Sequence, residues 1–100
     1  MTKNEKLSQP QVFHNAVEAR FELRVGEELC QINYRRTDDK LIIYRTAVPP
    51  ALEGRRFAAL MTLAALDFAR SEKLQVEPRC SYTAAFLQKH PEYADLLAPG

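Results

Sequence analysis

The sequence contains little cysteine, little glycine and no tryptophan, and its charges nearly balance. It has two cysteines and three glycines in 100 residues, with a formal net charge of +1. Two cysteines are too few for a disulfide scaffold. A balanced charge argues against a nucleic-acid-binding protein, which needs a clustered basic surface. No cysteine or histidine stands at the spacing of a zinc site, so we expect no metal centre.

Long apolar runs are also missing. No run reaches the roughly 18 residues that cross a bilayer, and the polar start of the chain lacks the apolar stretch of a signal peptide. We therefore expect a cytoplasmic protein with no membrane partner. A length of 100 residues fits one domain. The polar composition of residues 1–11 predicts a flexible N-terminal tail, which leaves residues 12–100 as the folded domain.

Hydrophobic periodicity predicts three antiparallel strands in the first half of the chain. From Glu18 to Val25, apolar and charged residues alternate, which predicts a half-buried strand. Gly26-Glu27 then predicts a hairpin turn, followed by a second strand from Glu28 to Arg36. The third strand, Leu41 to Val48, is apolar on both faces, which predicts a central strand covered by helices on both sides. On the inner face of the first strand we expect Ala19, Phe21, Leu23 and Val25.

The second half predicts two helices around a short strand. Apolar residues recur at helical spacing from about Phe57 to Lys73. A short strand, Leu74 to Glu77, follows, and Ser81 is the expected N-cap of a helix over Tyr82 to Lys89. A strand–helix–strand step favours a parallel pair. The predicted fold class is α/β: a single domain with a mixed sheet, formed by three antiparallel strands, a helix, a strand and a helix.

The segment from Val48 to Ala58 carries the strongest chemical signal. A strand ends there, two prolines turn the chain, and Gly54 opens a helix. The first turn of a helix has unpaired N–H groups and the positive end of the helix dipole, so it can bind phosphate. Arg55 and Arg56 add cationic donors beside it. On the residues alone, the segment is either a diphosphate site or an ordinary loop with two solvated arginines.

Two motifs in this chain resemble those of the GCN5-related N-acetyltransferases (GNAT). They are most similar to the branch of that superfamily whose chains are as small as this one. That branch reads Thr-Glu-Val-Pro-Pro, then Leu-Glu-Gly-x-Gly, and later Pro-x-Cys and Lys-His-Pro-Glu-Tyr. The resemblance extends from about Phe13 to Leu97. The matching runs here are Thr46-Ala47-Val48-Pro49-Pro50, Leu52-Glu53-Gly54-Arg55-Arg56, Pro78-Arg79-Cys80 and Lys89-His90-Pro91-Glu92-Tyr93.

The resemblance implies a GNAT-like fold that binds acetyl-CoA and transfers its acetyl group to an amine. It implies that the pantetheine of coenzyme A lies in a gap beside the central strand, along the backbone of Ala47 and Val48. Few residues remain to build an acceptor pocket, so we expect the unidentified amine acceptor to be large, with a protein or peptide among the candidates. The resemblance also implies that the diphosphate is held by backbone N–H groups of Gly54, Arg55, Arg56, Phe57 and Ala58.

The chain departs from this branch at two positions. Ala47 stands where the branch has an acidic residue, and in larger acetyltransferases a carboxylate on this strand often serves as general base. Arg56 stands where the branch has a second small residue, so its side chain either crowds the diphosphate or turns outward toward the 3′-phosphate. An alternative function is therefore a non-catalytic CoA-binding or interaction module with a degenerate active site.

Cys80 and His90 are the candidate catalytic residues. Cys80 follows the strand that should border the pantetheine, and the small branch carries a cysteine at this point. A thiol attacks only as a thiolate, and Arg79 and His90 are candidate partners for it. The alternatives are that Cys80 packs as a small hydrophobe and that His90 caps a helix end. Cys30, on the inner face of a strand, is predicted to be core.

Overall fold

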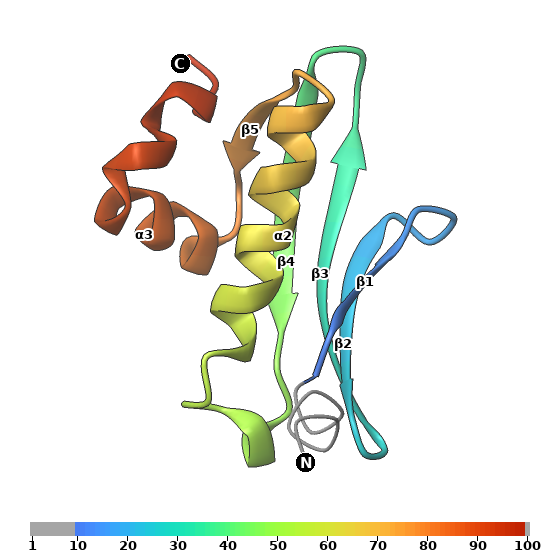
Figure 1. Ribbon diagram of the computed structural model, residues 1–100. Helices are drawn as coiled ribbons and strands as arrows, with labels where there is room; N and C mark the ends of the chain where they lie inside the picture. Colours follow the sequence, from blue (N-terminus) through green and yellow to red (C-terminus); the bar gives the residue numbers. More distant parts are fainter. Residues whose placement is uncertain (1–9, 100) are drawn as a thin grey trace, which may run out of the picture.

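The computed structural model describes residues 10–99, in which five strands form one mixed sheet in the order β1-β2-β3-β4-β5 (Figure 1). The first four strands are antiparallel neighbours, and β5 pairs parallel with β4. This confirms the predicted α/β class with a mixed sheet. The strands are β1 (Val12–Asn15), β2 (Arg20–Val25), β3 (Glu28–Arg36), β4 (Lys40–Ala47) and β5 (Gln75–Pro78).

Two helices follow β4. Figure 1 shows α2 (Phe57–Ser71), which links β4 to β5, lying along the sheet, with α3 (Ser81–Lys89) beyond β5. Two short 3₁₀ segments, η1 (Pro50–Leu52) and η2 (Pro91–Leu96), complete the described chain. None of the helices in residues 10–99 has the length and apolar character that a membrane crossing requires.

The core lies between α2 and one face of the sheet. Alternation along β2 and β3 directs every second side chain toward α2. Each fully buried aliphatic side chain of this kind stabilises the fold by roughly 1.5–3 kcal/mol relative to exposure. The largest fully buried side chains include Leu23, Ile32, Leu41, Ile43, Met61 and Leu66, and Cys30 is fully buried with them, as predicted.

The structure places a turn where the sequence pattern predicts the start of the first strand. Residues 16–19 turn back from β1, the Glu18 N–H donates to Asn15 Oδ1 at 3.1 Å, and Ala19 has a φ of 56°. The expected strand position of Ala19 is therefore wrong, and β2 begins at Arg20. The four-residue strand β1 was not predicted, because it is too short to show an alternating pattern. Most of the predicted flexible tail, residues 1–9, lies outside the described residues.

β4 is an inner strand, but only one of its faces is covered. Leu41 and Ile43 are fully buried, whereas Tyr44 is 49% exposed and Ile42 is half-buried. The prediction of helices on both sides of this strand is therefore wrong. A covering helix could have stood between β1 and β2, but a turn joins these strands. The second face of the sheet therefore stays open within residues 10–99.

A β-bulge at Tyr44 reverses the orientation of the rest of β4. Consecutive β3 residues pair with Ile43 and Arg45, so Tyr44 between them has no partner. An extra residue in one strand exchanges the two faces for the residues that follow. Ile43 faces the helices before the bulge, and Thr46 faces them after it. The hydroxyl of Thr46 therefore points to the side of the sheet where α3 begins.

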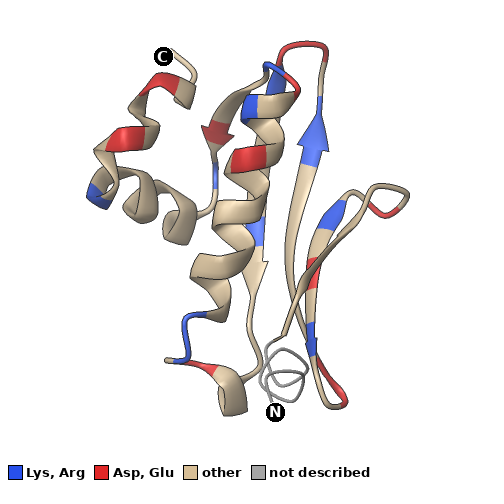
Figure 2. Cartoon of the chain, in the orientation of Figure 1, with Lys and Arg blue, Asp and Glu red and all other residues tan. Residues whose placement is uncertain are grey.

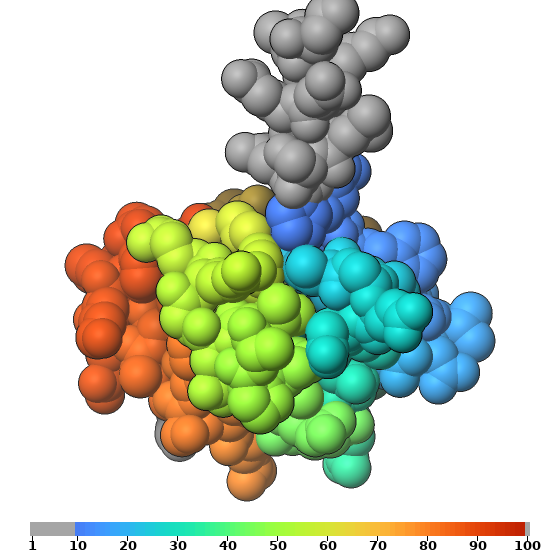
Figure 3. Space-filling model, turned by 90° about the horizontal axis from the view of Figure 1, so that it is seen from below, coloured from blue at the N-terminus to red at the C-terminus, as the bar shows by residue number. Residues whose placement is uncertain are grey.

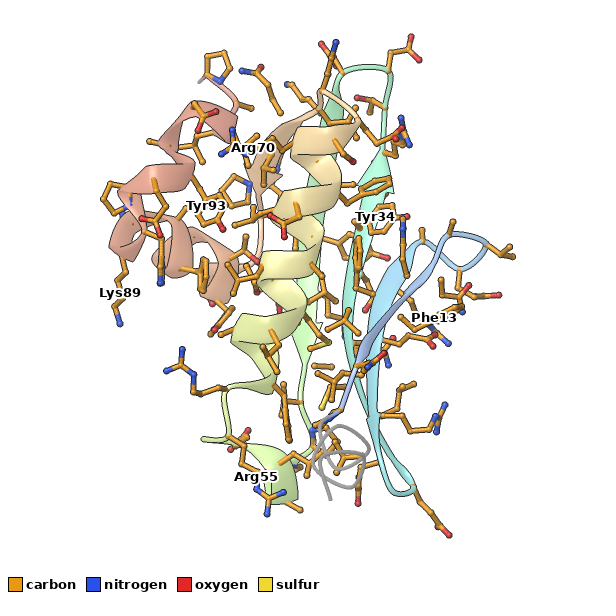
Figure 4. The ribbon with its side chains drawn as sticks, viewed as in Figure 1. Phe13, Tyr34, Arg55, Arg70, Lys89 and Tyr93 are labelled. Atoms are coloured by element: carbon orange, nitrogen blue, oxygen red, sulfur yellow. The ribbon has the colours of Figure 1, made fainter. Side chains whose placement is uncertain are left out.

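An aromatic cluster packs β1 against β2 and α2. The His14 ring stacks on Phe21 at 4.1 Å and meets Phe68 edge-on at 4.5 Å. Its Nε2 lies 2.6 Å from the Tyr34 hydroxyl, which Figure 4 labels. Burial lowers the pKa of His14, and the nearby positive charge of Arg36 lowers it further. The neutral imidazole is thus the form that packs here.

We expect His14→Gln to reduce the loss of stability on mild acidification. Because the folded-state pKa of His14 lies below its ordinary value of 6.5, its contribution is complete above that pH. It is lost as the pH falls from there through the folded-state pKa, since the unfolded chain then binds more protons. Urea unfolding midpoints between about pH 7.5 and about pH 5.5 measure the effect. An identical pH dependence in His14→Gln and the unaltered chain would show that this ring does not titrate with folding.

Candidate functional site

A cleft of about 830 Å³ lies where β4 ends and the chain turns into α2, a volume in the range of ligand sites. Figure 3 views the molecule from this end and shows the loop after β4 (yellow-green) beside the β2–β3 hairpin (cyan). The lining comes from β3, β4, the loop, α2 and α3: Leu29, Gln31, Arg45, Thr46, Ala47, Val48, Pro49, Leu52, Glu53, Gly54, Arg56, Phe57, Ala58 and Tyr82.

β4 and β5 separate beside this cleft. Their parallel pairing ends at Ile43 and Pro78. The N–H groups of Arg79 and Cys80 then both donate to the Ile43 carbonyl, at 2.9 and 3.1 Å. Beyond this point β4 continues to Ala47 without β5 as a neighbour. The end of β4 therefore presents an unpaired edge, whose N–H and C=O groups are free to bind an extended ligand.

The first turn of α2 forms the opposite wall of the cleft and carries no cap. No side chain bonds to its N-terminal N–H groups, and no acidic residue lies in the first turn. The first helical hydrogen bond runs from Leu60 N–H to Arg56 O at 3.1 Å, so the preceding N–H groups have no partner within the helix. Two of these residues, Phe57 and Ala58, line the cleft. Unpaired donors at the positive end of a helix suit an anion.

Two residues in the loop before α2 adopt left-handed backbone conformations. Gly54 has a φ of 81° and Arg56, the N-cap, a φ of 68°. Glycine adopts this region freely, but a residue with a Cβ is strained there by about 1 kcal/mol or more. A Cβ added at Gly54 would have no protein atom within 4 Å. Backbone conformation, rather than crowding by the protein, is therefore what favours glycine at this position.

The structure brings most of the predicted cofactor-binding residues together. Ala47, Val48, Gly54, Arg56, Phe57 and Ala58 all line the cleft, whereas Arg55 does not. Figure 4 shows Arg55 at the lower end of the molecule, on the outside of the loop.

Cys80, the N-cap of α3, does not line the cleft but adjoins it through a lining residue. Ser81, predicted for this role, is instead the first helical residue. The Cys80 Sγ lies 3.3 Å from Oγ1 of Thr46, a cleft residue. Burial by itself raises the pKa of the Cys80 thiol. Hydrogen bonds from the Thr46 hydroxyl and from the N–H groups of Thr83 and Tyr82 more than offset burial, so the pKa lies below its ordinary value.

Thr83 completes the surroundings of this thiol. Its side chain is fully buried, and its hydroxyl has no hydrogen-bond partner among the described residues. The same hydroxyl contributes to lowering the pKa of Cys80, because it can donate to a thiolate. A thiolate at a helix N-terminus, with hydroxyl and N–H donors around it, is the reactive form of cysteine. Sequence reasoning missed both threonines.

His90 and Arg79, the predicted partners of Cys80, lie elsewhere. His90 stands at the far end of α3, where its Nδ1–H donates to the Phe86 carbonyl at 2.8 Å, and it lines a neighbouring groove with Arg56 and Tyr82. The Arg79 guanidinium pairs with Glu77 on the side of the sheet that α2 does not cover. The donors around Cys80 are therefore neutral groups. Within residues 10–99, no cluster of three or more His, Cys, Asp or Glu side chains could hold a metal ion.

Comparison with known proteins agrees with this geometry. The family model described as GCN5-related N-acetyl-transferase matches residues 20–96. The match covers most of the chain, which therefore belongs to the GCN5-related N-acetyltransferase family. A GCN5-like protein from Staphylococcus aureus, solved in solution by NMR, shares the fold with a TM-score of 0.64. Its sequence is 23% identical, and the match covers 90% of this chain and 89% of that one.

We expect Arg56→Gly to stabilise the fold by about 0.5–1 kcal/mol. Glycine removes the left-handed strain at the N-cap of α2, and this gain exceeds its larger entropy in the unfolded chain. Arg55→Gly is the matched control, because Arg55 lacks a positive φ and should gain nothing. Urea unfolding gives both free energies. Equal or lower stability in Arg56→Gly than in Arg55→Gly would contradict the strain argument.

Proposed function

We propose that this chain binds acetyl-CoA in the cleft and transfers the acetyl group to an amine by way of Cys80. The observation that carries the proposal is the position of Cys80. It lies where β4 and β5 separate, beside a cleft whose opposite wall is an uncapped helix N-terminus. A thioester with a diphosphate needs these features together: a nucleophile, an extended channel and an anion site.

The described residues fit coenzyme A. The backbone N–H groups of residues 54–58 would hold the diphosphate, since those of α2 have no intrahelical partner and no acidic residue competes for them. The free edge of β4 at Ala47 and Val48 would accompany the pantetheine, whose amide groups can pair with a strand edge. Arg56 lines both this cleft and the groove against α3. Its guanidinium could therefore contact a phosphate bound at the loop.

In the proposed reaction, bound acetyl-CoA supplies an activated acetyl group as a thioester. The Cys80 thiolate attacks its carbonyl carbon. A bond to Sγ forms, the bond to the CoA sulfur breaks, and CoA leaves as a thiolate. A neutral amine then attacks the acetyl carbon, Cys80 leaves as a thiolate, and the amine loses a proton to solvent. The donors from Thr46 and from the first turn of α3 stabilise Sγ while it carries negative charge.

The alternative is a CoA-binding or interaction module without turnover. Ala47 favours it, because this position supplies no carboxylate to deprotonate an acceptor amine. Arg56 favours it as well, because its side chain adds bulk beside the expected diphosphate. A panel of amines incubated with acetyl-CoA separates the two: release of free CoA that depends on the amine supports transfer, and binding without release supports the module.

CoA should bind to the chain in a calorimetric titration, and Gly54→Val should weaken that binding at least about tenfold. A β-branched residue cannot adopt the left-handed conformation of Gly54 without strain, so the loop would change and misplace its N–H donors. Gly26→Val is the matched control. Gly26 also has a positive φ, 61°, with open space around it, and it does not line the cleft. The proposal fails if CoA does not bind, or if both variants retain full affinity.

Incubation with acetyl-CoA should acetylate Cys80 and leave Cys30 unmodified. Cys30 is fully buried, and burial raises the pKa of its thiol. Intact-mass and peptide mass spectrometry identify the modified residue. Cys80→Ala should keep CoA binding and lose most transfer, at least about a hundredfold, since the nucleophile is gone. Full transfer by Cys80→Ala would mean that the amine attacks the thioester directly.

A further inference from the structure

The uncovered side of the sheet has a distinct surface, here called the open face. Its side chains alternate with the core residues of the same strands and point away from α2. A groove of about 520 Å³ crosses it, with Ile42 and Tyr44 between Arg35, Glu77 and Arg79. The open face also reaches the cleft, because Leu29, Gln31 and Arg45 belong to both. A partner on this face would therefore touch the mouth of the cleft.

Positive charge is concentrated on the open face. The described part of the chain has twelve Lys and Arg against twelve Asp and Glu. Figure 2 shows several blue positions along the strands, where only β2 and β5 carry red ones, and further red positions on the hairpin turns, in α2 and in the C-terminal helices. By strand alternation and contacts, the open face carries six of the twelve cations but only two of the acids. These are Arg20, Arg24, Arg35, Lys40, Arg45 and Arg79, with Glu22 and Glu77.

Three of these cations have no carboxylate partner within residues 10–99. Glu22 pairs with Arg20, and Glu77 pairs with both Lys40 and Arg79. Arg24, Arg35 and Arg45 form no salt bridge there, and Arg45 reaches only the Asn33 amide oxygen, at 3.2 Å. Arg24 lies opposite Leu29, six residues from Arg35 along β3. Arg24 and Arg35 are therefore about 20 Å apart along the strands, which is the length of some six residues of an extended peptide. Arg45 lies between them.

We propose that the open face docks the acceptor: a protein segment rich in Asp and Glu whose lysine amine enters the cleft beside Arg45. This proposal rests on the proposed acetyl transfer. Unpaired arginines suit carboxylates, which they bind in bidentate fashion. Arg45, left free of these carboxylates at the mouth of the cleft, would lower the pKa of the lysine amine beside it, because like charges disfavour the protonated form. That increases the fraction of neutral nucleophile where no carboxylate at position 47 serves as base.

An acidic peptide fits this surface better than a nucleic acid does. Glu22 and Glu77 stand among the arginines, where they would repel a continuous phosphate backbone. The exposed aromatic side chains of this surface, Tyr44 in the groove and Phe13, lie on β4 and β1, three strands apart, whereas single strands bind on a series of stacking aromatic rings. Carboxylates spaced along a peptide can instead meet the arginines individually and avoid both acids.

The test measures peptide binding in the absence of acetyl-CoA. One labelled peptide carries a single lysine flanked by glutamates; its control carries glutamines in their place. We expect the glutamate peptide alone to bind at low salt, and Arg24→Glu/Arg35→Glu to weaken it roughly tenfold or more. Lys73→Glu/Lys89→Glu, which makes the same charge change outside this face, should have little effect. Circular dichroism and CoA affinity show that the double variant is folded, since neither arginine lines the cleft.

Several results would overturn the docking proposal: equal binding of the two peptides, equal weakening by Lys73→Glu/Lys89→Glu, or tighter binding of a single-stranded oligonucleotide of matched charge. A second measurement, acetylation of the same peptides, tests the proposed function separately. Arginine-dependent peptide binding without acetylation by acetyl-CoA refutes acetyl transfer and leaves the docking surface standing. Acetylation that is indifferent to the flanking glutamates refutes the docking surface and leaves the proposed function standing.

Discussion

The carbonyl of Ile43 is the point on which the site depends. By accepting hydrogen bonds from the N–H groups of both Arg79 and Cys80, it closes the parallel ladder and turns the chain after β5 directly into α3. β4 continues past this point without a neighbour. A longer ladder would fill the gap with backbone pairs and leave no free strand edge. The separation of β4 from β5 thus begins at one carbonyl that accepts two hydrogen bonds.

The bulge at Tyr44 makes that separation chemically useful. Without the extra residue, Thr46 would continue the alternation of the first half of β4 and point to the open face. With it, the Thr46 hydroxyl reaches Cys80 across the gap. The cysteine itself occupies an N-cap, where the donors of the first turn converge. The lowered pKa of the thiol therefore arises from backbone geometry and threonine hydroxyls, without a charged partner.

The sequence predicts the elements that long patterns define and fails where distant contacts decide. Alternation locates β2 and β3, and helical spacing locates α2, because each pattern extends over six residues or more. Residue chemistry predicts a phosphate-binding turn over residues 48–58, and motif resemblance adds Ala47 to the candidates. Apolar residues on both faces of β4 do not establish burial, since exposed apolar side chains are common. The Thr46–Cys80 contact spans 34 positions, and no local pattern signals it.

The open face follows from the connections between the strands within residues 10–99. With a turn between β1 and β2 and both described helices on the core side, a second helical layer is absent from residues 10–99. Such a face must still avoid association with other sheets, and interleaved charges achieve this. Charges of mixed sign would serve that purpose equally well. The excess of arginine over acid, and its continuity with the cleft through Arg45, therefore requires a further cause, and recognition of an acidic acceptor provides one.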